Sequence, residues 1–102
     1  MVIILIDSNI KDAVNAWCNG DTTTYGHIST WNTSNVTNMS ELFIYKSDFN
    51  DDISNWDVSN VTTMWGMFWH AHAFNQPIGD WNVSNVTTME CIFKHAHTFN
   101  QP

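Results

Sequence analysis

The stretch "WDVSNVTTMWGMF", residues 56–68, decides how this chain folds, because it occurs in three related copies. The other two are "WNTSNVTNMSELF" at 31–43 and "WNVSNVTTMECIF" at 81–93, which gives a period of 25 residues. Each copy also has an isoleucine three residues before its tryptophan and a later Phe-Asn pair. These positions are Ile28, Ile53 and Ile78, and Phe49, Phe74 and Phe99. Repeats of this length are typical of folds in which each unit buries its apolar side chains against its neighbours.

The apolar positions of one unit show two different spacings. Trp81 and Val83 alternate as in a strand, and the residues Val86, Met89, Ile92 and Phe93 share one face of a helix. Ile78-x-x-Trp81-x-Val83 also resembles the Leu-x-x-Leu-x-Leu pattern of leucine-rich repeats. We therefore expect an α/β fold: a short leucine-rich-repeat-like solenoid of 25-residue units, each with a short parallel strand and a short helix.

The chain divides into two regions by its pattern. Residues 1–30 lack the repeat and predict an N-terminal capping segment with one helix, started by Asp7 or Ser8 and stopped near Gly20. The apolar side of this helix is Ile10, Val14 and Trp17. Residues 31–102 form three tandem repeats, the last incomplete at Pro102. An uncovered last unit predicts self-association through the C-terminal end.

Composition and charge narrow the classes of partner. The chain has 102 residues, enough for one small domain, and a net charge of −7. This charge repels phosphate, so we expect no binding to nucleic acid or to an anionic membrane. The apolar start is too short for a signal peptide or for membrane insertion, which leaves the localisation unknown. Cys18 and Cys91 occupy unrelated positions of the pattern and are expected to be free thiols.

The unit "WDVSNVTTMWGMF" followed by "AFNQPIGDW" resembles the BspA-like repeat family of surface proteins. The resemblance covers residues 28–102, and "AVNAWCNG" leading to "YGHISTW" resembles the lead-in before such arrays. It implies a repeat array that mediates adhesion or protein interaction at a cell or particle surface, with no enzymatic activity and no catalytic residues. Arrays of the family are usually longer and exported, and this chain has histidines where the family has small or polar residues.

Four histidines form the most distinctive chemical pattern. His70 and His72 in "HAH" recur one unit later as His95 and His97. If this segment is extended, the histidines of both units project away from the alanine between them and converge, as a ligand set for Zn²⁺, Ni²⁺ or Cu²⁺ requires. The alternative is that the histidines are duplicated surface residues, since the first unit has Tyr45 and Ser47 there.

Two tryptophans are the best candidates for contact with a partner. Trp65 and Trp69 occupy positions that the other units fill with Ser40, Ile44, Glu90 and Lys94, so the repeat does not need them in its core. Exposed tryptophan often anchors an interface, whereas the alternative is that both rings fold over a neighbouring loop. Tyr45 is the third residue assigned to this surface.

Two further patterns carry weaker hypotheses. The carboxylates Asp48, Asp51 and Asp52 resemble a weak Ca²⁺ site but follow no known loop, so a solvated loop is the alternative. The "SNVT" sequons are acceptors for glycosylation only in a secretory pathway, and otherwise their Ser and Asn satisfy turns.

The sequence therefore predicts a non-enzymatic repeat module for protein–protein interaction or adhesion, with no resident cofactor. Two alternatives stay open: divalent metal binding by the histidine cluster, and a structural fragment of a longer repeat array.

Overall fold

The computed structural model describes residues 3–101. It begins with one helix, α1 (Ile10–Cys18), at the place where the sequence predicts one. Ile10, Ala13 and Val14 of α1 are buried, and Trp17 is half-buried. Asn9 precedes the helix without a side-chain capping bond, so the prediction that Asp7 or Ser8 caps it is wrong. A short 3-10 helix, η1 (Ile28–Thr30), leads into the repeats.

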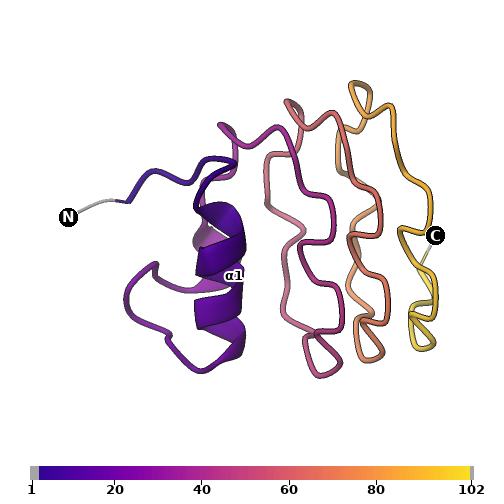
Figure 1. The fold of residues 1–102 in the computed structure, drawn as a ribbon, viewed down its shortest axis with the longest axis horizontal. Coiled ribbons are helices and arrows are strands. Elements are labelled where there is room, and N and C mark those ends of the chain that lie inside the picture. The colour runs from indigo at the N-terminus through magenta and orange to yellow at the C-terminus, as the bar shows by residue number, and fades with distance from the viewer. Residues whose placement is uncertain (1–2, 102) are drawn as a thin grey trace.

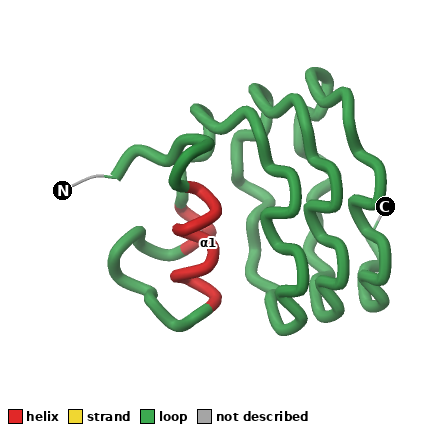
Figure 2. The backbone as a smooth tube through the Cα atoms, viewed as in Figure 1, coloured by secondary structure: helices red, strands yellow, loops and turns green. Residues whose placement is uncertain are grey.

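The repeats form three coils of chain that lie side by side, with α1 next to the first (Figures 1 and 2). We call them coil 1 (residues 31–55), coil 2 (56–80) and coil 3 (81–101). Among residues 3–101 no helix occurs in the coils, and in place of strands there are two isolated parallel bridges, Asn38–Thr63 and Thr63–Thr88. The predicted α/β fold, a leucine-rich-repeat-like solenoid with a strand and a helix in each unit, is therefore wrong.

Backbone hydrogen bonds explain why no helix forms. In coil 1 every second N–H group points to coil 2: Glu41, Phe43 and Tyr45 donate to the carbonyls of Trp65, Met67 and Trp69 at 2.8, 2.8 and 3.0 Å. Gly66, Phe68 and His70 donate in the same way to Glu90, Ile92 and Lys94 of coil 3 at 3.0, 2.8 and 2.9 Å. The residues between them donate three residues back within their own coil, as Leu42 does to Met39. A helix would use all these N–H groups internally, so the three-residue apolar spacing reflects consecutive turns instead.

Two positions in each coil have left-handed backbone, which makes these turns. The first is occupied by Glu41, Gly66 and Cys91, with φ of 59°, 60° and 60°. The second is occupied by Tyr45, His70 and His95, with φ of 59°, 60° and 61°. Glycine adopts this conformation without a steric penalty, whereas other residues pay about 1–2 kcal/mol. Five of these six positions therefore hold strain that the bonds between coils must offset.

Aromatic side chains form columns through the interior. Phe43, Phe68 and Phe93 stack with ring centroids 5.5 Å apart at each step. A second column contains Phe49, Phe74 and Phe99, at 5.7 and 5.8 Å. The indole of the tryptophan that begins each coil also donates to a carbonyl of the preceding segment: Trp31 to Gly26, Trp56 to Ile28 and Trp81 to Ile53, at 3.0, 2.8 and 3.2 Å. The repeat therefore places its large rings in the core and satisfies their polar atoms there.

The "SNVT" stretch makes polar contacts between coils. Asn60 donates its amide to the Ser34 carbonyl, and Asn85 donates to that of Ser59, both at 2.7 Å. At the start of the third unit the Asn82 side chain accepts from the backbone N–H of Ser84. These bonds are the structural role that the sequence offered as the alternative to glycosylation.

Asp7 satisfies the N-terminal side of coil 1. The Thr62 N–H donates to the Thr37 carbonyl, and Thr87 donates likewise to Thr62. Coil 1 has no coil before it, and the Thr37 N–H donates instead to Asp7 Oδ1 at 2.7 Å, while the Thr37 hydroxyl donates to Oδ2 at 2.6 Å. Burial raises the pKa of Asp7, but hydrogen bonds from Thr37 and Asn38 outweigh it and lower this pKa below its ordinary value.

The left-handed backbone at Gly66 predicts that substitution by alanine destabilises the protein at Gly66 but not at Gly79. Gly66→Ala should lower the free energy of unfolding by about 1 kcal/mol, because φ there is 60°. Gly79 is outside the left-handed region, so Gly79→Ala should be neutral or slightly stabilising. Urea denaturation of both variants tests this, and equal effects at the two glycines would contradict it.

Asp7→Asn should lower the free energy of unfolding by about 1 kcal/mol at pH 7, since it weakens charge-assisted hydrogen bonds at an exposed site. Because the folded pKa of Asp7 is lowered, its contribution is present above the unfolded value of about 3.9 and is lost as pH falls through the folded pKa. The variant should therefore lose less stability than the parent on acidification. Asp80→Asn, at an exposed carboxylate, is the matched control in urea denaturation at pH 7 and below pH 4.

Candidate functional site

The second left-handed position of each coil turns an aromatic side chain outward. Tyr45 stacks on His70 with ring centroids 4.8 Å apart, and His70 stacks on His95 at 4.7 Å. Tyr45 is 66% exposed, His70 is half-buried and His95 is exposed. We call these three residues the aromatic ladder. It crosses all three coils in register, because the N–H groups of Tyr45 and His70 donate to carbonyls of the next coil.

Trp65 and Trp69 lie next to this ladder on coil 2. Their rings meet edge to face at a centroid distance of 5.4 Å and an interplanar angle of 84°. Trp69 also stacks on His70 at 5.9 Å, and the Lys94 ammonium lies 5.5 Å from its ring centroid. Both tryptophans are half-buried, so each leaves part of its ring on the surface. The structure thus brings together Tyr45, Trp65 and Trp69, which the sequence assigns to one surface.

Gly66 lies beside Trp69 at a distance that leaves room for a methyl group. A side chain at Gly66 would bring its first carbon to 3.4 Å from Trp69 Cε3 and 3.6 Å from Glu41 Cγ. The indole Nε1 of Trp69 is buried and has no hydrogen-bond partner among the described residues. An unpaired buried donor costs about 1–3 kcal/mol, which the contacts of the Trp69 ring with Trp65, His70 and Lys94 must offset.

The four histidines lie close together, although His70 and His95 have left-handed backbone and not the extended backbone that the expected metal site requires. Ala71 and Ala96 are buried, whereas His72 and His97 are exposed beside the aromatic ladder, with ring centroids 5.3 Å apart. An imidazole nitrogen binds a metal in the plane of its ring, so the stacked pair His70 and His95, tilted by only 24°, does not direct its lone pairs to one point. Within residues 3–101 no group of three or more His, Cys, Asp or Glu could hold a metal ion.

Crowding changes the acidity of His70. The pKa of His70 is lowered. The largest cause is desolvation of its ring, and the charges of His95, His72, His97 and Lys94 add to it. The protonated ring is therefore disfavoured in the folded chain. The histidine rings therefore pack against one another as an aromatic column and do not form an open set of metal ligands.

A groove separates the end of α1 from coil 1. It has a volume of about 390 Å³, and one side is formed by Trp17, Cys18 and Asn19. The other side consists of Tyr45, Lys46, Asp48, Phe49 and Asp51. The Trp17 indole Nε1 donates to Asp51 Oδ2 at 2.9 Å across it. No pattern in the sequence predicts this groove, because Trp17 and Asp51 are 34 residues apart and no repeat relates them.

The acidic residues of coil 1 point to different partners. Asp51 binds the Trp17 indole, Asp52 accepts from the Ser54 N–H at 2.9 Å, and Asp48 is exposed in the groove. Because these three carboxylates have different surroundings, they do not form the Ca²⁺ ligand set that the sequence suggests.

Cys18 also borders the groove, and burial raises the pKa of its thiol. Cys18 and Cys91 are both free thiols.

Comparison with known proteins identifies a family. The family model described as "Mycoplasma protein of unknown function, DUF285" matches residues 9–102. The chain belongs to this family. No curated protein matches the chain, and no solved structure does. In the part of this DUF285 chain that the structure describes, no helix is long and apolar enough to cross a membrane.

The histidine cluster predicts a pH effect on stability. Since the folded pKa of His70 is lowered, its unfavourable contribution appears as pH falls below the unfolded value of about 6.5. The parent should lose thermal stability between pH 7 and pH 5.5. His70→Tyr, which copies the ring of Tyr45, should lose less over this range, and Ile4→Ala, at an exposed side chain that does not titrate, should behave as the parent. A scan by circular dichroism at the two pH values measures this, and equal losses in all three proteins would contradict it.

Proposed function

We propose that this DUF285 chain is a non-enzymatic module for protein–protein interaction or adhesion, of the kind that the resemblance of its repeats to the BspA-like family implies. It binds another protein through the surface formed by Tyr45, Trp65 and Trp69. The observation that carries the proposal is the placement of two half-buried tryptophans, edge to face, at positions where the neighbouring coils have small, aliphatic or charged residues.

The contacts of the two rings support this role. Tryptophan and tyrosine supply large contact areas with few rotatable bonds, and they are enriched at the centres of interfaces. Trp69 is held between Trp65, His70 and the Lys94 ammonium. Its ring is therefore ordered before a partner arrives, which reduces the entropy lost on binding.

The backbone below this surface is also ordered. The Trp65 and Trp69 carbonyls accept bonds from coil 1, and Gly66 and His70 donate bonds to coil 3. Such a support on both sides favours a rigid binding surface over one that folds when the partner binds. The net charge of −7 favours a partner with basic groups around the aromatic contact.

The repeat itself supplies the variant that tests the proposal. Trp65→Ser combined with Trp69→Ile installs the residues that coil 1 has at Ser40 and Ile44, on the same backbone. We expect this variant to keep its fold and to retain at least tenfold less partner protein on an affinity resin loaded with the chain. The partner is drawn from an extract of the source organism and quantified by mass spectrometry.

Ile4→Ala is the matched control, because Ile4 is 66% exposed and lies far from the tryptophans in sequence. It should capture the same proteins as the parent. Circular dichroism checks that both variants are folded. Capture that survives the double change unaltered in a folded protein would exclude this surface as the interaction site.

A further inference from the structure

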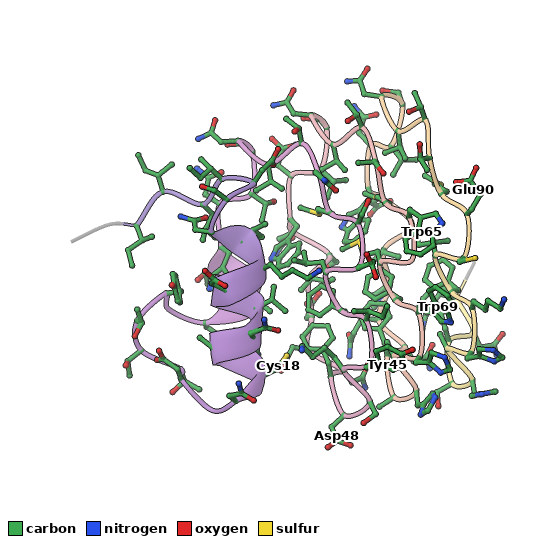
Figure 3. All side chains as sticks on the ribbon, in the orientation of Figure 1. Cys18, Tyr45, Asp48, Trp65, Trp69 and Glu90 are labelled. Atoms are coloured by element: carbon green, nitrogen blue, oxygen red, sulfur yellow. The ribbon has the colours of Figure 1, made fainter. Side chains whose placement is uncertain are left out.

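The groove between α1 and coil 1 has two aromatic walls. Trp17 is fixed by its hydrogen bond to Asp51 and by an edge contact with His27 at a centroid distance of 4.8 Å. Tyr45 comes from the opposite side and is held by stacking on His70. Figure 3 shows Cys18, Tyr45 and Asp48 around this part of the molecule, with Tyr45 toward the coils and Cys18 at the end of α1. Both rings that border the groove are therefore held by contacts with other side chains.

The charge of the groove is negative. Asp48 and Asp51 line it, opposed by the single ammonium of Lys46. The last turn of α1, which ends at Cys18, contains no basic residue, so the negative end of its helix dipole also faces this region. Asp51 is already bonded to Trp17, whereas no side-chain hydrogen bond within the described residues engages Asp48.

We propose that this groove binds the side chain of an arginine of the partner protein. A guanidinium is planar, stacks on aromatic rings and forms paired hydrogen bonds with a carboxylate, so it matches Trp17, Tyr45 and Asp48 together. A lysine ammonium would use the charge of Asp48 but not the two flat walls.

Tyr45 connects the groove to the proposed interaction surface. It borders the groove and is also the first ring of the aromatic ladder beside Trp69. One partner segment can therefore contact the tryptophans and place an arginine in the groove. The inference deepens the proposed function and depends on it for the source of the arginine, but the groove can be tested without the partner.

The test is a titration of the ¹⁵N-labelled chain with the peptide acetyl-Gly-Arg-Gly-amide, followed by NMR. The indole N–H signal of Trp17 is assigned by its loss in Trp17→Phe and reports on the groove directly. We expect a saturable shift of this signal in the millimolar range. The same peptide with citrulline, which is neutral and nearly isosteric with arginine, should cause no saturable shift.

Variants that remove one charge test whether the groove attracts the arginine through its negative charge. Asp48→Asn should weaken arginine binding at least fivefold, and Lys46→Gln should strengthen it, because it removes the only positive charge of the groove. Asp80→Asn changes the net charge equally at an exposed position outside the groove and should leave binding unchanged. Equal shifts with both peptides, or equal effects of Asp48→Asn and Asp80→Asn, would overturn the inference.

Failure of the groove and failure of the proposed function can be told apart. The variant with Trp65→Ser and Trp69→Ile should still bind the arginine peptide, since neither residue lines the groove. Partner capture that depends on the tryptophans without any arginine binding would overturn the groove alone. If the peptide binds but the double tryptophan variant captures the partner as well as the parent does, the proposed surface is overturned. The groove then remains a site for arginine side chains.

Discussion

The hydrogen bonds between coils are the constraint on which this structure depends. A helix satisfies its backbone polar groups internally, but over residues 39–45 and 64–70 every second N–H group donates to a carbonyl of the next coil. That requirement fixes the spacing between coils and prevents the apolar segments from forming helices. It also requires left-handed backbone at two positions per coil, where five of the six residues are not glycine. Local strain is thus retained by contacts that are distant in sequence.

The aromatic columns follow from the same register. When equivalent residues of successive coils are aligned by backbone bonds, identical side chains stack, and a phenylalanine is a better neighbour for another phenylalanine than a polar residue would be. The N-terminal end shows what happens where a coil has no predecessor. There the Asp7 carboxylate accepts the bond that a threonine carbonyl accepts elsewhere, and α1 covers the apolar side.

The sequence predicts the period, the buried rings and α1, because each of these depends on a local or repeated pattern of apolar residues. The expectation that the histidines project away from Ala71 and Ala96 assumes an extended segment, whereas His70 and His95 have left-handed backbone and His70 is half-buried. It does not distinguish a helix from consecutive turns, since both repeat apolar side chains about every third residue. The left-handed conformation of Glu41 and Tyr45 has no signal in their residue types, because glycine occupies only one of the equivalent positions.

The groove and the role of Asp7 were beyond prediction for another reason. Each joins residues about 30 or more positions apart that lie in different regions of the pattern: Asp7 with Thr37, and Trp17 with Asp51. A repeat reveals only contacts between equivalent positions, so contacts made by the non-repeated N-terminal segment require the structure.

This distinction bears on where specificity can arise. Residues that match between coils are needed to form the columns, and their replacement would disturb every neighbour. Residues that differ between coils at outward positions are not under that constraint. Trp65 and Trp69 differ from their equivalents in both neighbouring coils, and Tyr45 differs from the histidines that follow it. All three lie on one continuous surface that ends at a groove lined by the non-repeated helix. These three outward residues in which the coils differ therefore lie together, which is the arrangement expected of a binding surface supported by a uniform scaffold.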